Sequence, residues 1–180
     1  MKTKNTRKGF EQELLKAKQC IEKYEKERAV LKVQIPHLKD NIKWTQPNGK
    51  VEVKNSKNQV GLPVIKLSFT FPDGIQTTHH PSPGKAYGGG RFTGRLRTAP
   101  EGELLCRMLK AAFRGGLMFI VEKEGKVVLD GVSLYDYSVY ARDYIDYTRT
   151  LKAELAAKGI TEANTDQEEK LVETFTVDGW

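Results

Sequence analysis

The chain has 180 residues, with 30 lysines and arginines against 23 aspartates and glutamates, which gives a formal net charge of +7. This length suits one domain with an appendage, and a hydrophobic fraction of 38% excludes wholesale disorder. No apolar stretch approaches the roughly 20 residues that cross a bilayer, and the basic N-terminus lacks the apolar region of a secretory signal. We therefore expect a cytoplasmic or nuclear protein without membrane contact.

The positive charge is concentrated at the start of the chain. Residues 1–60 hold 15 basic and 7 acidic groups, whereas residues 61–180 hold 15 and 16. A basic segment is typical of proteins that bind nucleic acid or another anionic partner. One open interpretation is therefore a nucleic-acid-binding or scaffolding protein that acts through its N-terminal segment.

Residues 1–43 are predicted to form a basic helical arm. Apolar residues follow alternating steps of four and three, with Arg28 as the break: Phe10, Leu14, Ala17, Ile21, Tyr24, Leu31 and Ile35. The spacing predicts a long amphipathic helix that stops before Pro36, because proline disfavours helical geometry in the residue before it. The helix could pack on its own domain, form a coiled coil that makes a homo-oligomer, or be replaced by a disordered basic tail.

Residues 44–160 are predicted to form an α+β domain, with helices packed against a mostly antiparallel sheet. After a polar hinge at 45–49, period-two alternation predicts a strand over 64–71. A helix is expected at 103–114, a buried strand at 117–121 that turns back into a hairpin, and a last helix capped by Asp143. Residues 161–180 are predicted to be an acidic, polar and loosely attached tail.

Two segments could carry chemistry. Residues 73–97 form a long irregular stretch rich in glycine and proline, in which four basic residues could meet a phosphate: Lys85, Arg91, Arg95 and Arg97. A purely structural loop is the alternative, and His79 and His80 are expected to be turn residues. Residues 133–147 hold five of the seven tyrosines. They could stack on a nucleobase and bond a ribose, or simply form the edge of the core.

Several blocks in order resemble the C-terminal domain of the Deltex family of ubiquitin ligases. They are DGIQ, HPSPGKAYGG, EGELLCRMLKAAFRGGLMF and VSLYDYSVYARDYIDYTRTLKAELAAKGI, within residues 46–160. The resemblance implies a domain that binds ADP-ribose and NAD and recruits ADP-ribosylated targets. Beside a RING domain, such a domain helps to join ubiquitin and ADP-ribose.

The resemblance also implies site residues. Glu154 matches the family glutamate proposed to act as a base on a ligand hydroxyl, and Tyr140, fourteen residues earlier, matches a residue that lines the ligand. Ser133 stands where the family has a histidine. From the tyrosine-rich and glycine-rich segments we add Tyr137 and Arg91 as expected ligand contacts.

The replaced histidine changes the expected chemistry. A serine such as Ser133 cannot supply an imidazole that shuttles protons at neutral pH, so binding is expected to survive while catalysis weakens. Transfer of ADP-ribose or hydrolysis of NAD, with Glu154 as the base, is the enzymatic alternative. Cys20 and Cys106 cannot build a RING domain, so a ubiquitin ligase would require a RING-bearing partner in trans, and no metal is expected.

Overall fold

The computed structural model describes the backbone of residues 3–41 and 44–178, and the side chains of residues 7–30 and 44–178. The chain divides into two units, Met1–Lys43 and Trp44–Trp180. Among the described helices, none is long and apolar enough to cross a membrane.

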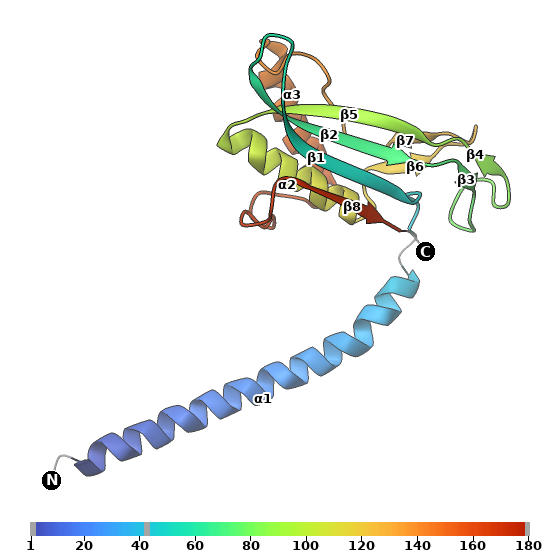
Figure 1. Ribbon diagram of the computed structural model, residues 1–180. Coiled ribbons are helices and arrows are strands. Elements are labelled where there is room, and N and C mark those ends of the chain that lie inside the picture. The colour runs from blue at the N-terminus through green and yellow to red at the C-terminus, as the bar shows by residue number, and fades with distance from the viewer. Residues whose placement is uncertain (1–2, 42–43, 179–180) are drawn as a thin grey trace. The chain divides into compact units, whose positions relative to one another are not determined.

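The first unit is helix α1, Thr3–Asn41 (Figure 1). The predicted long helix is confirmed, but the predicted stop before Pro36 is wrong. A proline inside a helix removes one backbone hydrogen bond, and a helix with favourable residues on both sides can continue through it. The side chains of Leu31 and Ile35 lie outside the described residues. Those of residues 7–30 are all exposed.

The second unit is built on an antiparallel sheet with the strand order β5-β2-β1-β8 (Figure 1). These strands are β1 (Gly49–Lys57), β2 (Pro63–Phe71), β5 (Gly90–Arg97) and β8 (Glu173–Val177). The other elements are β3 (Gly74–Ile75), β4 (Ala86–Tyr87), α2 (Pro100–Arg114), β6 (Phe119–Val121), β7 (Val127–Leu129) and α3 (Asp143–Ala157). The described helices and antiparallel strands confirm the predicted α+β fold.

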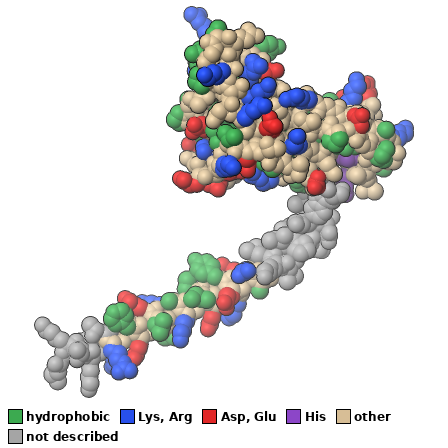
Figure 2. Space-filling model, viewed as in Figure 1, with side chains coloured by type: hydrophobic (Ala, Val, Ile, Leu, Met, Phe, Trp, Pro, Cys, Tyr) green, Lys and Arg blue, Asp and Glu red, His purple; other side chains and the backbone are tan. Residues whose placement is uncertain are grey.

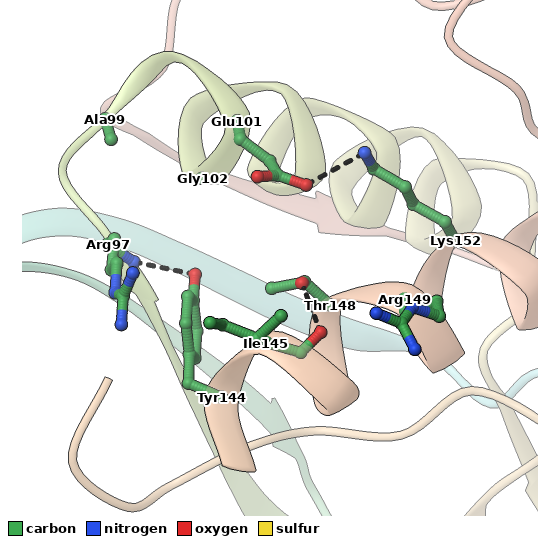
Figure 3. A pocket seen from close by; sticks show the side chains of 9 residues that line it. All are labelled: Arg97, Ala99, Glu101, Gly102, Tyr144, Ile145, Thr148, Arg149 and Lys152. Carbon is green, nitrogen blue, oxygen red and sulfur yellow. Dashed lines mark hydrogen bonds and ion pairs between the residues drawn. The ribbon is translucent and has the colours of Figure 1, made fainter. Parts of the chain in front are cut away.

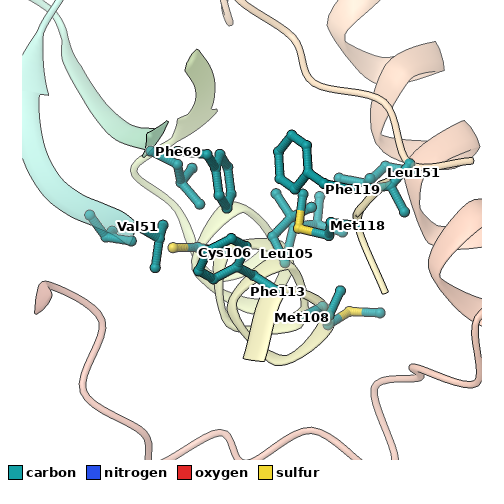
Figure 4. Packing of buried hydrophobic residues seen from close by; sticks show 14 of the residues in the cluster. Val51, Phe69, Leu105, Cys106, Met108, Phe113, Met118, Phe119 and Leu151 are labelled. Atoms are coloured by element: carbon teal, nitrogen blue, oxygen red, sulfur yellow. The ribbon is translucent and has the colours of Figure 1, made fainter. Parts of the chain in front are cut away.

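The core lies between the sheet and helices α2 and α3. The alternation in β2 is confirmed, since its predicted apolar face is buried: Ile65, Leu67, Phe69 and Phe71. Figure 4 shows Phe69, Phe113 and Phe119 meeting there, with ring centroids 5.2 and 5.4 Å from Phe69. Burial of such side chains contributes about 1.5–3 kcal/mol each, so this aromatic cluster is a main source of stability.

The predicted hinge at 45–49 is part of this core. Gln46 is buried, and its amide donates to the carbonyl of Phe113 (2.9 Å) while its oxygen accepts from the amides of Met118 and Phe119 (3.2 Å each). This side chain therefore joins the end of α2 to the start of β6. Strand β1, which directly follows, was not predicted, because Val51 and Val53 are its buried apolar residues in an otherwise polar sequence.

The hairpin and the two helices of this unit were predicted with small errors. Strands β6 and β7 pair antiparallel around Gly125, whose φ of 82° favours glycine. Helix α2 begins at Pro100 rather than at residue 103. Helix α3 begins at Asp143, but the Asp143 carboxylate accepts from the Tyr135 hydroxyl (2.8 Å) instead of capping the helix.

The predicted irregular stretch at 73–97 is wrong over its last part. Strand β5 pairs with β2, and Phe92 and Leu96 pack inward while the arginines alternate with them. Gly90 and Gly94 interrupt the apolar alternation in the sequence and concealed it. Arg91, Arg95 and Arg97 are therefore held on a strand of the sheet, whereas Lys85 lies in the turn before β4.

The predicted loose tail is also wrong, because β8 completes the sheet beside β1. Behind it, the ammonium of the fully buried Lys110 donates to the carbonyl of Lys170 (2.5 Å) and pairs with the carboxylates of Glu169 (3.5 Å) and Glu173. A buried ammonium needs such partners. The last segment is thus bound to α2 by charge as well as by strand pairing.

Candidate functional site

The carboxylate of Glu154 is fixed by one residue of the segment that follows β7. Its Oε2 accepts from the backbone amide of Ser133 (2.8 Å) and its Oε1 accepts from the Ser133 hydroxyl (2.7 Å). Both donors are neutral, and each carboxylate oxygen keeps lone-pair capacity. The carboxylate is therefore oriented but still able to accept a bond from a ligand hydroxyl.

Further contacts hold this segment against one side of α3. The hydroxyl of Tyr147, seven residues before Glu154 and so on the same side of the helix, donates to the carbonyl of Ser133 (3.0 Å). Burial raises the pKa of Tyr147, which keeps the hydroxyl neutral. The ammonium of Lys158 pairs with Asp130 (3.0 Å). Ser133 is thus held by Tyr147 directly, and the chain just before it is held to α3 by the pair of Asp130 with Lys158.

The tyrosine-rich segment divides into a buried and an exposed part. The Tyr135 ring stacks on Tyr147 with centroids 5.0 Å apart and meets Tyr144 edge-on at 5.6 Å. Burial and the bond to Asp143 raise the pKa of Tyr135 to about 12. In contrast, Tyr137 is 74% exposed and Tyr140 is 43% exposed. The core interpretation holds for the first group, and the second remains accessible to a ligand.

Tyr140 is anchored at the end of the sheet. Its hydroxyl donates to the carbonyl of Pro63 (2.8 Å), and the guanidinium of Arg97 lies 5.7 Å from its ring centroid. Arg97 also lies 4.7 Å from the Tyr144 ring centroid, and its Nε donates to the carbonyl of Val139 (2.5 Å). One ring face of Tyr140 is thus backed by a cation.

Tyr137 borders a hollow of about 340 Å³ beside β5. Arg95 lies in this hollow and pairs with Asp136 (3.2 Å), and its backbone amide donates to the carbonyl of Tyr135 (2.7 Å). The other lining residues are Asn58, Gln59, Val60 and Ser138. A guanidinium beside an exposed aromatic ring can bind a phosphate and a base together.

A second hollow of about 340 Å³ lies between the start of α2 and α3 (Figure 3). Arg97 and Tyr144 form one end, and Lys152 pairs with Glu101 (2.9 Å) at the other. Lys152 is two residues from Glu154 and therefore projects from the opposite side of the helix. This hollow is separate from the Ser133–Glu154 pair.

Arg91 lies apart from the other predicted site residues. It is exposed on β5 and acts electrostatically on Glu52, whose pKa is lowered first by the hydrogen bond from Lys54 and more weakly by Arg91. Among the described residues, no hydrogen bond or ion pair joins Arg91 to Ser133, Tyr140 or Glu154. The basic residues next to the tyrosine segment are Arg95 and Arg97, which the sequence had named with Lys85 and Arg91 as candidates to meet a phosphate.

In the second unit, His79 and His80 belong to a turn apart from the Ser133–Glu154 pair. His80 is buried, its Nδ1 accepts from the Thr77 amide (3.0 Å), and its Nε2 lies 3.1 Å from the carbonyl of Thr45, so this nitrogen carries the proton and donates. Burial lowers the pKa of His80. It is a turn residue, as predicted. Within the described residues, no group of three or more histidine, cysteine or acidic side chains could hold a metal ion.

Comparisons with known proteins agree with the motifs. The model of the Deltex C-terminal domain matches residues 43–160. The E3 ubiquitin-protein ligase DTX4 of Mus musculus is 28% identical over 141 residues, which cover 69% of this chain and 23% of that protein. The chain thus spans less than a quarter of the length of this relative. The family match covers more than half of the chain and includes strands β1, β2 and β5 of the sheet and helices α2 and α3, so the chain belongs to the Deltex C-terminal domain family.

Proposed function

We propose that this chain binds ADP-ribose or NAD through Ser133, Tyr140 and Glu154, and that it thereby recognises ADP-ribosylated protein or nucleic acid. The observation that carries the proposal is the Glu154 carboxylate, held by two neutral donors and open to a further hydroxyl. A ribose offers such a hydroxyl. The exposed rings of Tyr137 and Tyr140 suit an adenine base.

The diphosphate of such a ligand needs cationic or amide donors. Arg95 beside Tyr137 is the best-placed candidate, with Arg97 behind Tyr140 as the second. Arg91, which the sequence suggested, is the weakest of the three because it lies near Glu52. To bind the ligand phosphate, Arg95 would have to give up its ion pair with Asp136.

Binding is favoured over catalysis. Ser133 offers a hydroxyl and an amide, both already committed to Glu154, and no imidazole. A proton shuttle near neutral pH is therefore lacking at this position. In ubiquitin transfer the chain would act with a RING-bearing ligase in trans and supply the recognition of ADP-ribose.

Isothermal titration of the full chain with ADP-ribose and with NAD tests the proposal. We expect binding, weakened about tenfold or more by Tyr140→Ala and by Glu154→Gln, since the glutamine keeps an acceptor for Ser133 but loses the charge. Tyr24→Ala on α1, where the tyrosine is 64% exposed, is the matched control. Absence of heat at millimolar ligand would overturn the proposal.

The competing function is nucleic-acid binding through the basic N-terminal segment. It is favoured by the excess of eight positive charges in residues 1–60. It predicts salt-sensitive binding to RNA or DNA that disappears when residues 1–43 are removed. ADP-ribose binding would survive this deletion, so the same fragment separates the two functions.

A further inference from the structure

Helix α1 carries an apolar stripe that is exposed throughout residues 7–30. Phe10 is 72% exposed, Leu14 and Ile21 are each 57% exposed, and Tyr24 is 64% exposed. Figure 2 shows hydrophobic side chains surfacing between charged ones along this helix. Exposed apolar stripes mark interaction surfaces, and a helix of 39 residues takes most of its stability from a packed face.

The spacing of this stripe is that of a heptad repeat. Leu14, Ile21 and Arg28 occupy successive a positions, and the d positions are Phe10, Ala17 and Tyr24. A strict seven-residue repeat keeps the stripe facing one partner only if two helices supercoil around each other. The stripe therefore fits another helix with the same repeat better than a globular surface.

We propose that α1 pairs with α1 of a second copy of this chain in a parallel, in-register coiled coil. In that arrangement each g residue faces the e residue of the next heptad on the other helix. Glu13 is at g and Lys18 is at the following e, so each copy contributes one attractive pair to the other. Within one helix the two residues are five apart and do not face each other.

The opposite orientation brings like charges together. In an antiparallel pair, g residues face g residues and e residues face e residues. The register that overlaps residues 10–28 would then oppose Glu13 to Glu27 and Glu11 to Glu25. In the parallel pair, by contrast, Glu27 of the second copy lies beside Arg28 and partly offsets the cost of a charged a position.

A nucleic acid is a less suitable occupant of this stripe. Residues 7–30 hold seven basic and five acidic groups, and the acidic ones are interleaved with the basic ones along the helix. Phosphate backbones attract faces with a continuous positive charge. A second copy of α1 can instead pair with both the basic and the acidic side chains, and it buries the apolar stripe.

Sedimentation of the full chain over about a hundredfold range of concentration tests the pairing. We expect a monomer–dimer equilibrium whose dissociation constant rises about tenfold or more in Leu14→Glu. Leu15→Glu is the matched control, because Leu15 is equally exposed at 57% but lies outside the a and d positions of the stripe. A monomer at every concentration, equal effects of both substitutions, or association that nuclease abolishes would each overturn the proposal.

Cross-linking tests the orientation. In a Cys20→Ser background, Phe10→Cys should give a disulfide-linked dimer under mild oxidation, whereas Leu15→Cys should not; the buried Cys106 does not compete. Glu13→Lys should weaken the dimer about fivefold, and adding Lys18→Glu should restore it, because each dimer holds two such pairs. A dimer that persists without a cross-link from the Phe10→Cys variant, or without charge-swap rescue, would contradict the parallel arrangement.

Discussion

Glu154 and Glu173 are both partly buried carboxylates, but they have partners of different kinds. Glu173 pairs with the fully buried ammonium of Lys110 and lies 3.4 Å from the guanidinium of Arg114. Glu154 accepts from the neutral amide and hydroxyl of Ser133. A buried cation must keep its counter-charge, so Glu173 serves stability, whereas Glu154 retains a charge that a ligand can use.

Removal of residues 161–180 should produce the largest effect on stability. The truncation takes away β8, Glu169 and Glu173, and with them both carboxylates that pair with the Lys110 ammonium. Breaking a buried ion pair costs about 3–5 kcal/mol, and the exposed edge of β1 adds to this. Urea denaturation of the full and truncated chains measures the difference. Equal urea midpoints would instead support the prediction from the sequence that residues 161–180 are a loosely attached tail.

Lys110→Ala should lower the free energy of unfolding by about 3 kcal/mol, because it removes a buried side chain and its ion pairs together. Lys152→Ala is the control: this lysine also pairs with a glutamate, but its side chain is 45% exposed. A surface pair contributes about 0–1 kcal/mol. If the two substitutions cost the same, the distinction drawn between Glu173 and an ordinary surface carboxylate fails.

The pH dependence of stability should reveal Glu173. The hydrogen bond from Lys110, and then the charges of Lys110 and Arg114, hold the pKa of Glu173 below its ordinary value of 4.5. The folded state therefore favours the ionised form. Its stabilising contribution is present above pH 4.5 and is lost as the pH falls through the lower, folded pKa. Glu173→Gln should flatten the dependence of the free energy of unfolding on pH in this acid range. An unchanged profile would show that groups other than Glu173 cause this dependence.

Ser133→Ala should have the smallest effect on stability, about 1 kcal/mol, because the backbone amide still donates to Glu154. Its effect on ligand binding should be larger, since the carboxylate loses one of the two bonds that orient it. Titration with ADP-ribose compares the two effects, with Ser133→Thr as the variant that keeps the hydroxyl. A loss of stability without a loss of affinity would make the Ser133–Glu154 pair structural, like Lys110 and Glu173.

Local periodicity predicted the elements that bury a regular apolar face. Strand β2 and helix α2 were found this way because alternate or every third and fourth residues are apolar. Strands β1 and β8 were missed because their sequences are mostly polar: β8 has Phe175 partly buried and Val177 buried, and hydrogen bonds to a neighbouring strand supply the rest. Glycines hid β5.

Ser133 and Glu154 were predicted as site residues only through family motifs. Glu154 has no local signal, since it occupies a partly exposed position on a helix with lysines nearby. Its contact with Ser133 joins residues 21 apart in the chain, which no periodicity reports. The division of the tyrosines into buried and exposed groups was likewise hidden, because all five lie within one short segment.

The sequence by itself determined the family, the α+β class and the heptad spacing of α1, because motifs and apolar periodicity are local properties of the chain. The tertiary structure decided which charges meet. It placed Glu169 and Glu173 on the buried Lys110 and turned a predicted tail into a strand of the sheet. It also set Ser133 against Glu154, because pairing between distant residues depends on how the elements pack and not on their order.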